Sequence, residues 1–176
     1  MKTKAFLIRG LWGFLWSRGM DALAGKLMAA GIEAEVWSKG IVGYLNVRRI
    51  ADAAFDAAAS GRKIILGGHS MGADAAVMVA EKLAAKKVSV ALLATFDPTP
   101  FGCPPLPGNV AKAINFYQRN SALGRAEFKP GPGFKGLLLQ RRVDTIHVRS
   151  DDDPKLHAVV LAEAAALLTT NTKAPR

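Results

Sequence analysis

Cysteine is nearly missing from this chain of 176 residues. Cys103 is its single cysteine, so the chain cannot form an internal disulfide. Half of the residues are hydrophobic, which is enough for a sizeable core without cross-links. This composition fits a reducing compartment, or a secreted protein that needs no cross-link, and we expect a cytoplasmic protein. Because Cys103 lies in a proline-rich loop with no adjacent base, we interpret it as a structural or incidental thiol.

Long uncharged hydrophobic runs are also missing. The N-terminus imitates a signal peptide, because Lys2 and Lys4 precede a mostly apolar stretch over residues 5–16. Arg9 interrupts that stretch, and no charge-free segment reaches the length that spans a bilayer. We therefore predict that residues 5–8 form the first strand of the core.

Acidic residues are scarce relative to basic ones. The chain has 14 Asp and Glu against 24 Lys and Arg, for a formal charge of +10. Such a field attracts polyanions, anionic membrane surfaces or acidic substrates. The basic residues are scattered, however, and their densest region, residues 119–142, has few aromatics and no nucleic-acid motif. We expect a solvated surface, without nucleic acid as a partner and with at most weak contact with a membrane surface.

Motifs for a metal or a cofactor are absent from the sequence. The three aspartates at 151–153 lack the spacing of a calcium-binding loop and suit the start of a helix. The glycines at 67 and 68 precede a serine and do not form a phosphate-binding fingerprint. We therefore predict no metal and no cofactor.

The most informative stretch is the pentapeptide Gly-His-Ser-Met-Gly at residues 68–72. It fits the G-x-S-x-G nucleophile elbow, in which a strained turn between a strand and a helix exposes a serine hydroxyl. Residues 63–67 are short, apolar and β-branched, as in a buried strand, and apolar residues recur at helical spacing after Ser70. Side chains at Gly68 and Gly72 would collide with the neighbouring strand or helix. The alternative is a glycine-rich turn that only packs.

Strands and helices alternate along the rest of the chain. Strands are predicted at the segments 5–8, 33–37, 63–67, 88–96, 113–117 and 137–148. Helices are predicted from Met20 to a stop at Gly31, over 47–60, after Ser70, and after a cap at Asp153. This order predicts an α/β fold, a single doubly wound, mostly parallel sheet with helices on both faces. We expect one domain over residues 1–168 and a frayed tail over 169–176.

In element order and at the elbow, the chain resembles the α/β-hydrolase superfamily, in a minimal form like the lidless bacterial lipases and esterases. The first strand followed by Gly10-Leu11 resembles the oxyanion loop of these enzymes, although Arg9 stands where many members have histidine. The resemblance implies a serine hydrolase, and members cleave esters, thioesters, amides and lactones. It also implies that the backbone N–H groups of Leu11 and Met71 form the oxyanion hole.

The catalytic base must be one of three histidines. His69 lies inside the elbow, and its place next to the serine points it away from the serine's face. In the hydrolases that the chain resembles, the catalytic histidine occupies the loop before the final helix, where His147 lies. His157 falls in the first turns of that helix, where we expect a structural role. We predict His147 as the base and keep His157 as the alternative.

Asp97 is the predicted acid of the triad. It ends the apolar strand 91–96, and the chain order serine, acid, histidine is that of the hydrolases that the chain resembles. Many members carry the acid one strand later, but residues 115–119 contain no carboxylate. Asp144 is too near His147 along the chain to reach its ring easily. The alternative for Asp97 is an aspartate that only caps a loop.

Two classes of function follow from these residues. The first is a serine hydrolase that cleaves carboxylic esters, thioesters or lactones through an acyl-enzyme on Ser70, with Trp12 and Phe14 as candidate walls of an acyl pocket. The second is a non-catalytic module of the same fold that binds an acyl ligand or a protein. Acyl transfer to another alcohol is a third possibility. The long loops at 98–107 and 118–136 have no strong helical stripe, so we expect an open site without a helical lid.

Overall fold

One parallel sheet forms the centre of the molecule. The computed structural model describes residues 2–10, 18–37, 46–100, 103–118 and 127–169. Within them, six strands pair in the order β2-β1-β3-β4-β5-β6, and every pairing is parallel. The strands are β1 (Thr3–Ile8), β2 (Glu33–Trp37), β3 (Lys63–His69), β4 (Val90–Phe96), β5 (Lys112–Tyr117) and β6 (Leu137–Arg142).

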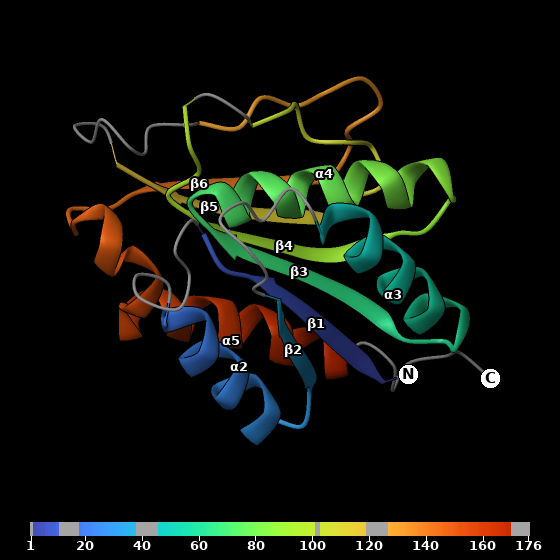
Figure 1. Ribbon diagram of the computed structural model, residues 1–176, viewed down its shortest axis with the longest axis horizontal. Helices are drawn as coiled ribbons and strands as arrows, with labels where there is room; N and C mark the ends of the chain where they lie inside the picture. Colours follow the sequence, from blue (N-terminus) through green and yellow to red (C-terminus); the bar gives the residue numbers. More distant parts are fainter. Residues whose placement is uncertain (1, 11–17, 38–45, 101–102, 119–126, 170–176) are drawn as a thin grey trace.

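Helices cover both faces of this sheet (Figure 1). The helices are α2 (Gly19–Ala29), α3 (Val47–Ala59), α4 (Met71–Ala85) and α5 (Pro154–Thr169), with a short 3₁₀ helix η2 (His147–Asp152). One core cluster joins α3 and α4 to the sheet, and a second joins α2 and α5 to the opposite face. This arrangement confirms the predicted doubly wound α/β sheet. In such sheets, ligands bind outside the carboxyl ends of the strands, near the point where the strand order reverses.

Local signals in the sequence account for several of the observed helix ends. Gly31 and Gly61 follow α2 and α3 with φ of 82° and 78°, a backbone conformation that glycine adopts without steric cost. At the start of α5, the carboxylate of Asp153 accepts a hydrogen bond from the Lys155 N–H at 2.8 Å. That contact confirms the predicted cap, with Pro154 as the first helical residue. The helix continues through Thr169, one residue past the predicted domain boundary, and residues 170–176 lie outside the described part.

The prediction for the last strand was wrong in its length. An extended segment was expected over residues 137–148, but β6 ends at Arg142 and His147 begins η2. The last residue pair of the β5–β6 ladder is Tyr117 with Arg142, followed by one further bond from the Val143 N–H to the Tyr117 carbonyl. Once β5 ends, the chain has no strand to pair with, and it turns into a helical conformation.

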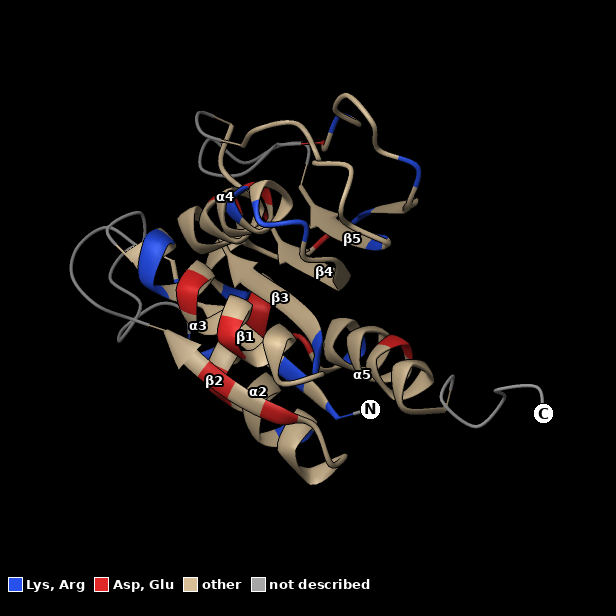
Figure 2. Ribbon diagram, turned by 90° about the vertical axis from the view of Figure 1, so that its right-hand side faces the viewer, with Lys and Arg blue, Asp and Glu red and all other residues tan. Residues whose placement is uncertain are grey.

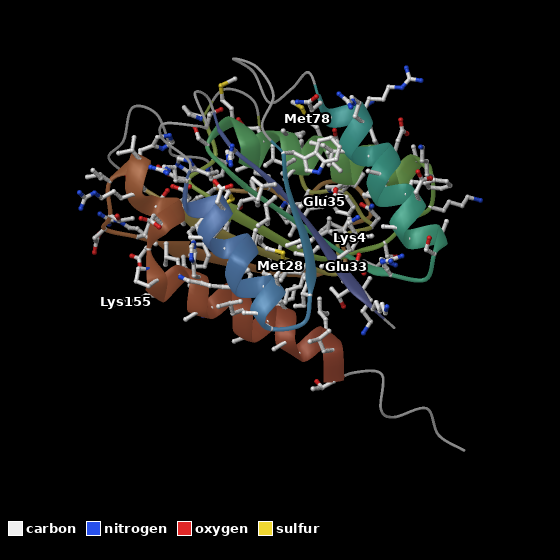
Figure 3. The ribbon with its side chains drawn as sticks, turned by 60° about the horizontal axis from the view of Figure 1, so that its bottom comes forward. Lys4, Met28, Glu33, Glu35, Met78 and Lys155 are labelled. Atoms are coloured by element: carbon white, nitrogen blue, oxygen red, sulfur yellow. The ribbon has the colours of Figure 1, made fainter. Side chains whose placement is uncertain are left out.

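Charged residues are distributed over several elements and not gathered on one (Figure 2). Ion pairs link neighbouring elements, such as Lys4 of β1 with Glu35 of the edge strand β2 at 2.5 Å, both labelled in Figure 3. Lys86 and Asp52 pair across α3 and α4 at 2.7 Å. Such exposed pairs each contribute little to stability. In the part of the chain that the structure describes, no helix has the length and apolar character needed to cross a membrane.

Candidate active site

Ser70 occupies the sharp turn between β3 and α4. Its φ is 56° and its ψ is −128°, a strained backbone conformation for a residue with a side chain. A Cβ at Gly68 would lie 2.2 Å from the carbonyl oxygen of Gly72, and a Cβ at Gly72 would lie 2.2 Å from the carbonyl oxygen of Ile8. The two glycines therefore permit the close approach of α4 to β1 and β3, as the elbow motif predicts.

Strand register places Asp97 beside the elbow. His69 of β3 pairs with Phe96 of β4, and the Ser70 N–H donates to the Phe96 carbonyl at 2.9 Å. The next residue, Asp97, is fully buried, and its Oδ1 accepts a hydrogen bond from the Gln118 N–H at 3.0 Å. The serine and the carboxylate therefore lie at the same level of the sheet, one strand apart.

The His147 ring lies between these two side chains. Its Nδ1 is 2.7 Å from Asp97 Oδ2, and its Nε2 is 3.0 Å from Ser70 Oγ. An ionised carboxylate only accepts hydrogen bonds, so Nδ1 carries the proton and Nε2 presents a lone pair to the serine hydroxyl. This is the geometry that a serine nucleophile and its base require. The structure thus brings together the three residues predicted as the triad.

The helix α4 begins directly at the nucleophile. Met71 is its first residue, and the N–H groups of Ala73 and Asp74 donate back to the Ser70 carbonyl. The first N–H groups of a helix have no acceptor within the helix, and they carry the positive end of its dipole. An oxyanion next to Ser70 would lie at this end. The remaining predicted residues of the site, Leu11, Trp12 and Phe14, lie outside the described residues.

Comparisons with known proteins agree with this architecture. No protein-family model and no curated protein matches the sequence. Solved structures do match over nearly the whole chain. A protein of the alpha/beta hydrolase superfamily from Xanthomonas campestris pv. campestris has 18% identity and a TM-score of 0.60, covering 96% of this chain and 99% of its own.

Two further structures have similar values. The RedJ thioesterase of prodiginine biosynthesis in Streptomyces coelicolor has 14% identity and a TM-score of 0.66, covering 92% of this chain and 90% of its own. The ydeN gene product of B. subtilis has 12% identity and a TM-score of 0.62, covering 92% and 98%. This chain has the α/β-hydrolase fold. At these identities, the likeness concerns the fold alone.

Within the α/β-hydrolase fold, the described part of the first strand's loop departs from the pattern of many members. Arg9, which stands where they have histidine, donates from Nε to Asp21 Oδ2 at 3.0 Å. Its N–H donates to the Trp37 carbonyl at 3.1 Å. Arg9 therefore joins β1 to β2 and to α2.

One contact that was not predicted from the sequence joins Asp74 to Thr99, in the loop that follows the acid Asp97. Asp74 of α4 is fully buried, and its carboxylate accepts hydrogen bonds from the Thr99 N–H at 3.1 Å and the Thr99 hydroxyl at 2.5 Å. Thr99 lies two residues after Asp97, so this contact fixes the acid loop against the helix that follows the nucleophile. The only signal in the sequence was an acidic residue in the first turn of a predicted helix, which usually has a simpler explanation in the helix dipole.

The other two histidines are both buried. His157 donates from Nε2 to the Asp151 carbonyl at 2.5 Å, and its Nδ1 accepts from Lys26 Nζ at 2.9 Å, so it joins α5 to η2 and α2. Burial lowers the pKa of His157 below its usual value. These contacts give His157 the structural role that was expected. Burial likewise lowers the pKa of His69 to about 3, so this ring is neutral.

The remaining candidates for chemistry have little support. Burial raises the pKa of the Cys103 thiol far above its usual value, helped by the charges of Asp74 and Glu81, and a thiol with a raised pKa is unreactive. The rival acid Asp144 is exposed. Among the residues that the structure describes, no three His, Cys, Asp or Glu side chains are grouped so that they could hold a metal ion.

Proposed function

We propose that this protein is a serine hydrolase that cleaves carboxylic esters or thioesters through an acyl-enzyme on Ser70. The observation that carries the proposal is the His147 ring, within hydrogen-bond reach of both Ser70 Oγ and Asp97 Oδ2. A non-catalytic binding module has no need for a strained serine, a base and a buried carboxylate in one line.

Acylation begins when the Ser70 hydroxyl attacks the carbonyl carbon of the ester. His147 Nε2 takes the hydroxyl proton as the new O–C bond forms, and Asp97 stabilises the resulting imidazolium. The carbonyl oxygen becomes an oxyanion, which the N–H groups at the start of α4 stabilise. As the tetrahedral species collapses, the bond to the leaving group breaks, and His147 gives its proton to the departing alcohol or thiol.

Deacylation uses the same groups with water as the nucleophile. His147 Nε2 takes a proton from water, whose oxygen attacks the acyl carbon. The bond to Ser70 Oγ then breaks, and the proton returns to this oxygen while the carboxylic acid leaves. If another alcohol replaces water, the protein transfers the acyl group, and product analysis distinguishes the two outcomes.

The substrate class that we propose is a small acyl ester or thioester. Thioesterases are among the structures of similar fold, including the Streptomyces coelicolor enzyme. A panel of p-nitrophenyl esters and acyl thioesters of increasing chain length would identify the preferred leaving group and acyl length.

Labelling with a fluorophosphonate tests the proposal directly, because the probe reacts with activated serines. We expect one adduct per chain, located on Ser70, in a protein that also cleaves esters from the panel. Ser70→Ala should remove both the labelling and the cleavage while the circular dichroism spectrum stays unchanged. Ser60, an exposed serine at the end of α3, serves as the control, and Ser60→Ala should label like the wild type. Cleavage that survives in Ser70→Ala would refute the proposal.

A further inference from the structure

The backbone carbonyl of His147 accepts two hydrogen bonds from buried side chains. His69 Nε2 lies 2.9 Å from this oxygen, and the Ser150 hydroxyl also lies 2.9 Å from it. His69 is 2% exposed and Ser150 is fully buried, so both donors are shielded from water. Both donors therefore fix the backbone of the residue that carries the base.

One of these donors is the chain neighbour of the nucleophile. His69 is the last residue of β3, and Ser70 follows it directly. Ser70 Oγ contacts the His147 ring at 3.0 Å, while His69 contacts the His147 backbone. The His69 and His147 rings also pack together, with centroids 4.9 Å apart. Two consecutive residues thus contact the ring and the backbone of His147, which links the position of the base to that of the nucleophile.

The chemistry of the contact defines the tautomer of His69. A carbonyl oxygen only accepts, so Nε2 of the neutral ring must carry the proton. The other nitrogen, Nδ1, faces the carboxyl group of Asp151 at 3.7 Å. That carboxyl group is fully buried and lies next to the backbone N–H groups of Gly19 and Met20, in the first turn of α2. His69 is therefore a buried neutral ring with one donor, and this donor is used on the base.

We propose that His69 is a positioning residue for the His147 base, acting through the hydrogen bond from its Nε2 to the His147 backbone carbonyl. This inference rests on the proposed function, in which His147 removes the proton from Ser70. A base that shifts by about 1 Å can lose about a hundredfold in rate, so a contact that fixes its backbone matters for turnover.

Two substitutions separate the hydrogen bond from the volume of the side chain. His69→Gln places an amide N–H near the former Nε2, whereas His69→Phe keeps an aromatic ring but has no donor. We expect His69→Phe to lower kcat by about 10- to 100-fold with KM nearly unchanged, because the loss concerns positioning of the base. His69→Gln should keep kcat within about threefold of the wild type. Equal kcat values in the two variants, or a larger loss in Gln than in Phe, would overturn the proposal.

A control variant distinguishes a specific effect on kcat from a general loss of protein stability. The Asn109 side chain donates to the Ala80 and Val88 carbonyls at 3.0 and 2.8 Å. It lies at the amino end of β4, whereas Ser70 lies at the carboxyl end of β3. Asn109→Ala also removes side-chain hydrogen bonds to backbone carbonyls, so it should lower the unfolding midpoint without changing kcat. Should His69→Phe fail to fold, His69→Asn takes its place, because its side chain is too short to donate to the His147 carbonyl. It should lower kcat relative to His69→Gln with KM nearly unchanged, and equal kcat values in these two variants would overturn the proposal.

A nuclear magnetic resonance signal tests the inference without a substrate. The proton between His147 Nδ1 and Asp97 is expected at low field, and it should be sharp in the wild type and in His69→Gln. In His69→Phe it should broaden or disappear, because the His147 backbone has lost its donor. A sharp, unshifted signal in His69→Phe would overturn the role of His69. Failure of the proposed function differs from this result, because it would appear as absent labelling of Ser70 in the wild type.

Discussion

Each of the three side chains at the candidate site is held by a different kind of contact. Ser70 is placed by a backbone turn that only close packing around two glycines permits. Asp97 is buried and bonded to the Gln118 N–H, which leaves its other oxygen for the base. His147 is held through its ring by the other two and through its carbonyl by His69 and Ser150. Substitutions of these three residues should therefore lower the rate by different amounts.

The ranking of rate losses follows from these roles. His147→Ala should lower kcat nearly as much as Ser70→Ala, by roughly 10⁴- to 10⁶-fold, because residues of a triad act as a unit. Asp97→Asn should cost less than either, since the serine and histidine remain but the tautomer of the ring is less favourable. Steady-state kinetics on a soluble ester measures all three. A larger loss for Asp97→Asn than for His147→Ala would contradict the assigned roles.

Asp151 makes the stability of the protein depend on pH. Burial raises the pKa of its carboxyl group to about 7, so the folded protein keeps a proton that the unfolded chain releases near pH 4. Stability is therefore lost as the pH rises from about 4 to about 7, by at most about 4 kcal/mol at about 1.4 kcal/mol for each pKa unit. Asp151→Asn removes this loss, because an amide does not ionise.

Urea denaturation between pH 4 and pH 8 checks this effect. The free energy of unfolding of Asp151→Asn, minus that of the wild type, should increase from pH 4 to pH 7 and stay level above. His69 has the opposite effect, because its ring stays neutral in the folded state while it is protonated in the unfolded chain. The folded protein therefore loses stability as the pH falls below about 6.5. Taking the difference between the two proteins removes the contribution of His69. A difference that does not vary with pH would show that Asp151 is not buried as described.

At the scale of elements, the local sequence predicts most of the fold. Apolar β-branched runs and helical stripes place the strands and helices with boundaries that differ by a few residues at most, except at the last strand. That strand was predicted too long because residues after Arg142 still look extended, while its end depends on where β5 ends. A contact between strands far apart in the sequence decides such a boundary, and a local pattern does not contain it.

The residues of the candidate site were likewise predicted only where the local sequence or the chain order contains the signal. Ser70 is evident from five consecutive residues, and Asp97 and His147 follow from chain order in a resembling family. The contacts of His69 and Asp74 join elements that are distant in the sequence. Spacing and composition do not predict these contacts, because a buried polar side chain cannot be distinguished from an exposed one in the sequence until its partner is known.

The packing of α4 against β1 gives a prediction about one element. Gly72→Ala would place a Cβ against the backbone of Ile8, which cannot move away as a flexible side chain can. We expect it to destabilise the protein by roughly 2 kcal/mol or more and to lower the rate, because α4 must shift. Gly25→Ala is the matched control in α2, where a Cβ meets nothing within 4 Å, and it should stabilise by up to about 1 kcal/mol. Thermal unfolding measures both, and equal midpoints would contradict the described packing.

At the scale of the whole molecule, the described residues around the site contain no helical lid. The loops at 98–107 and 118–136, where described, are irregular, and their residues 101–102 and 119–126 lie outside the described part. We therefore expect the rate on a short-chain ester to follow simple saturation through its solubility limit, because no closure by a lipid surface is needed. A sharp rise of the rate at that limit would contradict an open site.

The central claim is a covalent acyl group on Ser70. Mixing the wild type with a slowly hydrolysed ester and quenching in acid should give a protein whose intact mass has increased by one acyl group, with the modified peptide containing Ser70. The same adduct should be absent from Ser70→Ala and should disappear from the wild type at the rate of turnover. Ester turnover with no adduct on Ser70, or with the acyl group on another residue, would contradict the proposed mechanism.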